Sequence, residues 1–398
     1  MRVDKSDAVF FLEAKTGIKV VAVTLFLIVC SWWMSLLSLG VDSANLYSGE
    51  IHQIFYFEPY LSKWLAGFLF SILGSAGLSF LGLVAIPISI FFILFSVFRR
   101  HLHPEWALFL ALLSISVFEG YPLRAFLSDL IFMNFENIGS DKLPTLSGFP
   151  IPSVPMLLFV AVFWLATSNW LAFPSITRTI VVTILVSVFA YVSPIDLVLA
   201  AAFWAIYVPV RWFRAGWKLK FIAFGCLLHA VIAACIILPA LLMGQIDPTL
   251  PRNEDLELYS LFAYFIVPLC MTVALIIVQK VDPQELLFSF GHVFALMLAE
   301  FSVLLTASFG LFPIDLDIFQ NRSPQFFAHA LYYMPVIYLA SRTAFPTTVG
   351  SESLPASVFV RKALSAFFVK LRPFVTGVLV LVLLSYNLVC SLTFISRI

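Results

Sequence analysis

Residues 19–63 read KVVAVTLFLIVCSWWMSLLSLGVDSANLYSGEIHQIFYFEPYLSK, which is one long apolar run followed by a polar loop. The apolar part, 19–40, is long enough for a helix to cross the hydrocarbon core of a bilayer. The loop 41–63 carries Asp42, Glu50 and Glu58, together with His52 and a single cation, Lys63. The sequence therefore predicts a first membrane span that leads into a carboxylate-bearing loop.

The composition of the whole chain agrees with a membrane protein. Of 398 residues, 62% are hydrophobic and only 11% are charged, and the mean hydropathy is +1.03. A soluble protein with so few charges would not stay dispersed, so lipid must be the solvent for most of the chain. The net charge of +1 excludes a basic field for nucleic acid. The five cysteines lie in apolar runs, with neither a disulfide framework nor metal-ligand spacing.

We expect an all-α fold, a polytopic transmembrane helix bundle that forms a single integral membrane domain over residues 1–398. Hydropathy predicts eleven spans, several of them shorter than the usual length, at 19–40, 76–98, 104–119, 154–173, 178–193, 196–210, 221–243, 259–279, 285–308, 326–341 and 373–395. Residues 64–73 are predicted to form an interfacial helix that leads into the second span, with Gly74 and Gly77 at the bend.

The distribution of Lys and Arg predicts the orientation. With the N-terminus cytoplasmic and eleven spans, 17 of the 23 Lys and Arg residues fall in inner segments and six in outer ones. This bias follows the positive-inside rule and places the C-terminus outside. Fourteen of the 22 acids fall in the outer segments instead. The longer loops, 41–63, 120–153, 244–258 and 309–325, are outer as well, so we expect the outer face to carry the function.

Two short features are predicted near the outer face. Residues 178–193 and 196–210 form a helical hairpin that turns at Ser193-Pro194-Ile195-Asp196. Residues 122–135, PLRAFLSDLIFMNF, place apolar side chains at helical spacing with Arg124 and Asp129 on the other side. This pattern indicates an amphipathic juxtamembrane helix.

Asp42 and Glu50 are the candidates for a general base. A base needs a carboxylate within hydrogen-bond reach of the proton, sheltered enough for its pKa to rise. The alternative is that both are solvated loop acids. His52, two residues from Glu50, is a candidate for binding the substrate or its lipid phosphate, as a partner of the base or as a metal ligand. The alternative is that this lone loop histidine has none of these roles.

Arg322 and Arg124 are two of the six outer cations and are candidates for binding a phosphate, because Arg makes bidentate phosphate contacts. The alternative is pairing with Asp315 or Asp317 for Arg322, and with Asp129 for Arg124.

Glu300 is the one carboxylate predicted to lie deep in a span. Such residues often mark ion or proton paths. A proton path would need more ionisable groups than His292, in the same span, and His229, in another span. We therefore expect Glu300 to be buried and hydrogen-bonded to a neighbouring helix.

The layout resembles the GT-C class of membrane glycosyltransferases, which take sugars from polyprenyl-phosphate donors. Ser48-Gly49-Glu50-Ile51-His52-Gln53, after the first span, is similar to the Asp-Glu loop motif of that class, with Gly49 where a second acid often stands. A span ending in Arg99-Arg100, a short span closing on Glu119-Gly120-Tyr121-Pro122, the juxtamembrane helix, the hairpin at Ser193 and the late loop with Arg322 also resemble it.

The resemblance implies transfer of a hexose or pentose from a polyprenyl-phosphate-linked donor to a glycan, lipid or protein acceptor, by an inverting displacement on the periplasmic or luminal face. Glu50 or Asp42 would be the base, and Arg322 and Arg124 would hold the phosphate. Some members of the class use Mg or Mn and others do not. The rival hypotheses are a transporter or flippase for lipid-linked saccharides, and a non-catalytic component of an envelope polysaccharide assembly system. Compact loops favour a bacterial inner membrane.

Overall fold

The structure is a computed structural model. It describes Leu25, Ile28, Val29, Trp32 and residues 60–116, 123–134, 153–167, 175–242, 258–279, 281–308, 330–343 and 374–393. The regular elements in this part of the chain are all helices, as the sequence predicts.

The described helices have the following bounds. In chain order they are α3 (Tyr60–Phe80), a π-helical turn η1 (Leu81–Ala85), α4 (Ile86–Phe98), α5 (Pro104–Ile115), α6 (Leu123–Ile131), α7 (Ser153–Thr167), α8 (Ile176–Val192), α9 (Pro194–Arg214), α10 (Leu219–Leu242), α11 (Leu258–Gln279), α12 (Pro283–Ser308), α15 (Met334–Thr343) and a C-terminal helix (Phe374–Thr393).

Five helical stretches of the described chain are long and apolar enough to cross a membrane. They are Leu81–Phe98, Asp196–Arg214, Leu219–Leu242, Ser289–Thr306 and Phe374–Thr393. Shorter apolar helices occur at α5, α7, α8 and α11 and at residues 330–340, which fall within further predicted spans. The chain is therefore a helical integral membrane protein, and the count of eleven spans stays a prediction.

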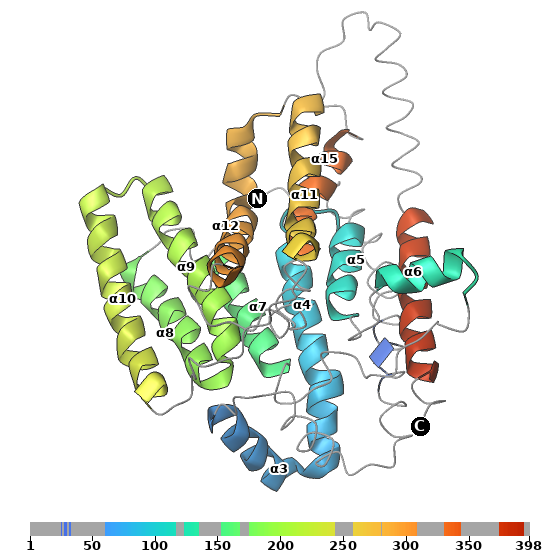
Figure 1. Ribbon diagram of the computed structural model, residues 1–398, viewed down its shortest axis with the longest axis horizontal. Coiled ribbons are helices and arrows are strands. Elements are labelled where there is room, and N and C mark those ends of the chain that lie inside the picture. The colour runs from blue at the N-terminus through green and yellow to red at the C-terminus, as the bar shows by residue number, and fades with distance from the viewer. Residues whose placement is uncertain are drawn as a thin grey trace, which may run out of the picture.

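The helices form a bundle around a continuous apolar core (Figure 1). α12 packs against α9, α10 packs against α8, and α4 packs against both α5 and α7. α10 lies at one edge of the bundle in this view, and the C-terminal helix lies at the opposite side. In Leu81–Phe98, Asp196–Arg214 and Ser289–Thr306, half or more of the residues are buried inside the bundle. α10 is mostly exposed, as expected for a helix that faces lipid.

The region 60–98 bends where the sequence predicts a bend. Gly74 has φ 66° and ψ −174°, a conformation that glycine adopts without steric cost, and α3 kinks there. Gly77 remains helical, so Gly74 alone makes this kink. A π-helical turn at η1 then leads into α4, where Pro87 stands in the first turn.

The predicted hairpin between α8 and α9 is confirmed. Ser193 breaks the helix with an extended backbone (φ −159°, ψ 96°), and Pro194 starts α9, where its missing N–H costs nothing. α9 continues to Arg214, four residues beyond the predicted end. The extra turn contains the fully buried Trp212, whose indole stacks on Trp217 at 5.1 Å.

Other boundaries also differ from the prediction. α5 ends at Ile115 because Ser116 leaves the helical region (φ −92°, ψ 66°), whereas the span was predicted to reach residue 119. The predicted amphipathic helix over 122–135 is α6, which ends at Ile131. Met133 then takes a positive φ of 53°, which ends the helical path.

The buried hydroxyl groups along α8 are hydrogen-bonded within the helix. α8 carries Thr179, Thr183 and Ser187 at a spacing of four, and Thr183 and Ser187 donate to the carbonyls of Thr179 and Thr183. This row also joins α8 to its neighbours, because Trp204 Nε1 of α9 donates to Thr183 Oγ1 at 2.8 Å. On the α10 side, His229 Nε2 lies 2.8 Å from Thr179 Oγ1. Small polar residues at such spacing typically mark helix contacts in membranes.

Candidate functional site

Most of the predicted site residues lie outside the described part of the chain. Asp42, Glu50, His52 and Arg322 belong to this group, so their proposed roles stay predictions. Arg124 is the second residue of α6, which fixes its place in the fold without describing its side chain. α6 is therefore the part of the predicted site whose place in the fold the structure describes.

α6 packs across the C-terminal helix (Figure 1). The rings of Phe126 and Tyr386 lie 5.5 Å apart, and both side chains are buried. Leu123 and Leu127 are half-buried against the core, so α6 presents the apolar face that its spacing predicts. Tyr386 precedes the last residue of its helix by seven positions, which is about 10 Å at 1.5 Å per residue. α6 thus meets a membrane-spanning helix well inside its ends.

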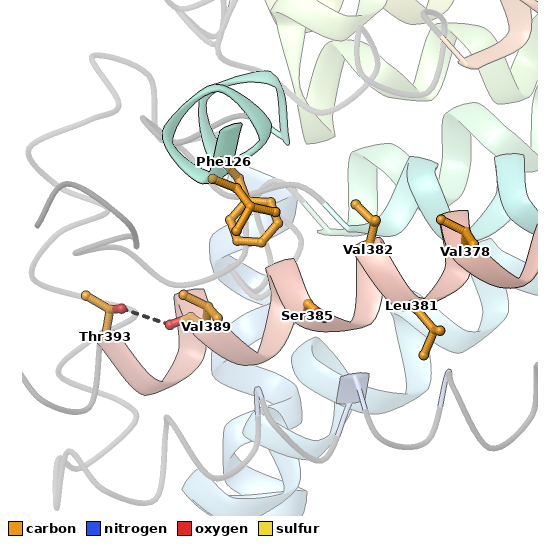
Figure 2. Close-up of a pocket in the computed structure, with 8 residues that line it drawn as sticks. Phe126, Val378, Leu381, Val382, Ser385, Val389 and Thr393 are labelled. Atoms are coloured by element: carbon orange, nitrogen blue, oxygen red, sulfur yellow. Dashed lines mark hydrogen bonds between the residues drawn. The ribbon is translucent and has the colours of Figure 1, made fainter. Parts of the chain in front are cut away.

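A groove of about 600 Å³ lies between α6 and the C-terminal helix (Figure 2). We call it the α6 groove. Phe126 points from α6 toward the C-terminal helix, where Val378 and Val382 point to the α6 side and Leu381 points away from it. Phe126, Leu130, Val378, Leu381, Val382, Ser385, Val389 and Thr393 line it. The row from Val378 to Thr393 extends about 22 Å along the helix axis.

The chemistry of the α6 groove is that of a site for hydrocarbon. The lining includes no ionisable side chain, and its two hydroxyls belong to Ser385 and Thr393. Thr393 Oγ1 donates to the carbonyl of Val389 at 2.9 Å, so that hydroxyl is already satisfied. An apolar, open groove beside a membrane helix can hold a lipid chain. Binding such a chain leaves no ionisable side chain of the lining buried without a partner, so it carries little desolvation cost.

Asn387, which follows Tyr386 in the C-terminal helix, connects this helix to the first predicted span. Trp32 Nε1 donates to Asn387 Oδ1 at 3.1 Å, and both side chains are fully buried. Asn387 Nδ2 also donates to the carbonyl of Leu383 at 2.8 Å. Trp32 and Asn387 stand at similar positions within the predicted spans 19–40 and 373–395. This contact was not predicted from the sequence, although a lone Asn in an apolar helix is a signal that could have indicated it.

Glu300 is buried and hydrogen-bonded, as the sequence predicts. Its side chain is 2% exposed, and the hydroxyl of the fully buried Tyr332 donates to its Oε2. His292 precedes Glu300 by eight residues, about 12 Å along the axis of α12, so the two groups are too far apart for direct proton transfer. The contact with Tyr332 gives Glu300 a structural role.

His292 instead belongs to an aromatic cluster at the start of α12. Its ring lies 5.4 Å from that of His101 and 5.6 Å from that of Phe163, and His101 also contacts Phe290 at 5.0 Å. His101 lies in the turn between α4 and α5. Burial, and then the neighbouring Arg100, lower the pKa of His101 to about 4, so its ring is neutral at pH 7.

The described residues contain no group of three or more His, Cys, Asp and Glu side chains placed to hold a metal ion. Carboxylates that could serve a metal, Asp42 and Glu50, lie outside the described residues.

Fold and groove together define the class: a helical integral membrane protein with an apolar groove of about 600 Å³ between an amphipathic helix and the C-terminal helix. Comparison with protein-family models, with curated proteins and with solved structures gave no match to this chain.

Proposed function

We propose that this protein is a membrane glycosyltransferase that transfers a sugar from a lipid-phosphate carrier to an acceptor. The observation that carries the proposal is the α6 groove, an apolar site of about 600 Å³ whose lining residues are spread over about 22 Å of a membrane helix. A lipid-linked sugar needs such a site, because its long hydrocarbon chain must be held while its headgroup reacts. A small apolar metabolite would not need a groove of this length.

The amphipathic helix α6 supports a lipid with a charged head. Phe126 and Leu130 line the groove, and Arg124 and Asp129 belong to the same helix. Within this proposal Arg124 and Arg322 bind the phosphate, since guanidinium groups match phosphate geometry. His52 stands in the same loop as the proposed base and contacts the substrate headgroup.

The proposed chemistry is a single displacement. Glu50 or Asp42 takes the proton from an acceptor hydroxyl as the oxygen attacks the anomeric carbon, and the lipid phosphate leaves from the opposite face with inversion. A bound Mg or Mn ion would assist departure of the phosphate in members that use one. No step assigned to this chain's residues depends on it.

The transporter hypothesis is less well supported than the enzyme. A carrier typically lines its path with ionisable groups near the membrane midplane. Glu300 is hydrogen-bonded by Tyr332, and His292 contacts aromatic rings instead of Glu300. Neither arrangement supports a continuous path across α12.

The test is sugar transfer by membranes that contain single variants. Glu50→Gln, Asp42→Asn and Arg322→Gln are compared with Glu257→Gln and Arg252→Gln, matched controls in another predicted outer loop. Loss of the base lowers transfer by about 10²- to 10⁴-fold, the usual contribution of general base catalysis. Full transfer by all three site variants would remove the proposal.

A further inference from the structure

The C-terminal end of α6 carries an exposed apolar stretch. Phe126, one turn earlier, is buried, whereas Leu130, Ile131, Phe132 and Met133 are 45%, 71%, 78% and 76% exposed. We call these last four residues the apolar tip. Contiguous large apolar side chains with this exposure are unusual on a water-facing surface, and they typically mark contact with lipid or with another protein.

The backbone at the apolar tip is closed by hydrogen bonds within the chain. Met133 has a φ of 53°, and its N–H donates to the carbonyl of Leu130 at 3.4 Å. The N–H of Asn134 donates to the carbonyl of Asp129 at 2.8 Å. This is the pattern of a Schellman motif. Carbonyls that are bonded within the chain suit a helix end that lies in hydrocarbon, because no water is present there to bond them.

Met133 adds an apolar side chain to the tip at a conformational cost. The left-handed position of a Schellman motif is usually a glycine, which adopts a positive φ freely. A methionine is sterically disfavoured in that conformation. Since the Met133 side chain is mostly exposed, it contributes to the surface of the apolar tip and not to the core of the bundle.

The position of α6 on the C-terminal helix gives the depth of the apolar tip. α6 crosses this helix, and the rings of Phe126 and Tyr386 lie 5.5 Å apart (Figure 1). Tyr386 lies seven residues before Thr393, the end of the span, which is about 10 Å along the axis. The span itself is about 30 Å long, the thickness of the hydrocarbon core. α6 therefore meets the span at the depth of the acyl chains of the leaflet nearest residue 393.

The composition of the apolar tip favours acyl chains over a second protein helix. Helices that associate in membranes do so through small residues, which let the backbones approach closely, and through polar side chains. The tip sequence, Leu-Ile-Phe-Met, has neither kind of residue. Large apolar side chains are typical of amphipathic helices that bury one face about 5–10 Å into a membrane.

The apolar tip is continuous with the α6 groove. Leu130 belongs to the tip and also lines the groove, together with Phe126 one turn earlier. The groove lining has no ionisable side chain, and the tip has none either. A hydrocarbon chain that passes Leu130 therefore meets apolar surface on its way from the bilayer to the groove.

We propose that the apolar tip inserts among the acyl chains of the leaflet nearest residue 393 and forms the entrance through which a lipid chain passes from the bilayer into the α6 groove. The entrance rests on the proposed function in that the groove holds a lipid chain, whereas the insertion does not depend on it. The tip has two roles: it holds α6 at its depth, and Leu130 joins the bilayer to the groove.

The first test identifies what the apolar tip touches. p-Benzoyl-phenylalanine replaces Phe132 or Ser128 in the full-length protein, which is irradiated in phosphatidylcholine vesicles and analysed by mass spectrometry. Ser128 is the matched control, because it is exposed on the same helix outside the tip. We expect a phosphatidylcholine adduct at position 132, and about fivefold less at position 128. Equal adducts at both positions, no adduct at position 132, or cross-linking of position 132 to a second copy of the chain would overturn the insertion.

The second test measures entry into the α6 groove. A polyprenyl phosphate with a diazirine in its chain is added to proteoliposomes, which are irradiated after increasing delays, and labelling of residues 378–393 is followed. Phe132→Asp places a charge among the acyl chains and should slow the labelling about tenfold, whereas Ser128→Asp, with the same charge, should slow it less than about twofold. Both positions are exposed, so the melting temperature and the final extent of labelling should stay unchanged.

Each outcome of the second test is decisive. Equal rates for Phe132→Asp and Ser128→Asp would overturn the entrance. No labelling of residues 378–393 in the unchanged protein would overturn the entrance together with the groove as a lipid site. Neither test needs sugar transfer, so a protein without transferase activity would still show the adduct at position 132 and the slower entry in Phe132→Asp.

Discussion

The contact between Trp32 and Asn387 gives the sharpest stability prediction. Asn387→Leu removes the acceptor of a fully buried indole N–H and puts an apolar side chain of similar size in its place. Leaving a buried donor unsatisfied costs about 1–3 kcal/mol in soluble proteins. Hydrogen bonds between membrane helices average nearer 0.6 kcal/mol and reach about 1.7. Because both side chains are fully buried, we expect the free energy of unfolding to fall by about 1–2 kcal/mol.

A double-mutant cycle isolates this hydrogen bond. Trp32→Phe removes the donor, and the double variant removes both partners. The coupling energy should be about 0.6–1.7 kcal/mol, measured by unfolding the purified protein in mixed micelles. Leu388→Ala, on the exposed side of the same helix, serves as the control for the helix itself. A coupling energy near zero would mean that the first and last predicted spans do not touch here.

Three further predictions concern other parts of the bundle. Glu300→Leu should lower the free energy of unfolding by about 1–3 kcal/mol because it leaves the Tyr332 hydroxyl without its acceptor. Glu300→Gln keeps an acceptor and should cost less. Equal losses of stability in a thermal unfolding assay would contradict the structural role of Glu300. Gly225→Ala places a Cβ 2.5 Å from the Trp212 ring, and this clash should lower the free energy of unfolding by about 1–3 kcal/mol. Adding Trp212→Phe, which has a smaller ring, should make the Gly225→Ala change less destabilising. An equal cost of Gly225→Ala in both backgrounds would argue against the clash. The free energy of unfolding should keep its full value above pH 6.5 and fall by up to about 3 kcal/mol toward pH 4, because between these values the unfolded chain protonates His101 and the folded chain does not. Melting curves at pH 7.5, 5.5 and 4.5 measure this dependence, and His101→Phe should abolish it. An unchanged pH dependence in that variant would mean that another group causes it.

Local patterns in the sequence predict much of this fold. Hydropathy locates the helices of the described chain, the Ser193-Pro194 turn predicts the α8–α9 hairpin, and Gly74 predicts the kink in α3. The buried Glu300 follows from the cost of a carboxylate in lipid. Each of these features depends on residues close together in the chain.

Contacts between distant segments were not predictable in the same way. Hydropathy gives the length of a span but not its neighbours, so the partners Trp32 and Asn387, 355 residues apart, required the structure. Arg100 joins the end of α4 to the end of α7, and Arg214 joins the end of α9 to α12. The positive-inside rule predicts only that these ends share a side. The α6 groove likewise depends on how α6 lies on a helix some 250 residues later.

Photolabelling with a lipid-linked donor tests the central claim most directly. A polyprenyl-phosphate sugar with a diazirine in its chain is added to the protein in proteoliposomes, and the labelled peptides are identified by mass spectrometry. We predict that the label attaches to α6 and to residues 378–393. Unlabelled polyprenyl phosphate should prevent this labelling, whereas phosphatidylcholine should not. Ser385→Trp, which fills the groove, should reduce the labelling, whereas Leu388→Trp should not. Labels outside the α6 groove, or labelling that phosphatidylcholine displaces equally well, would contradict a donor site there.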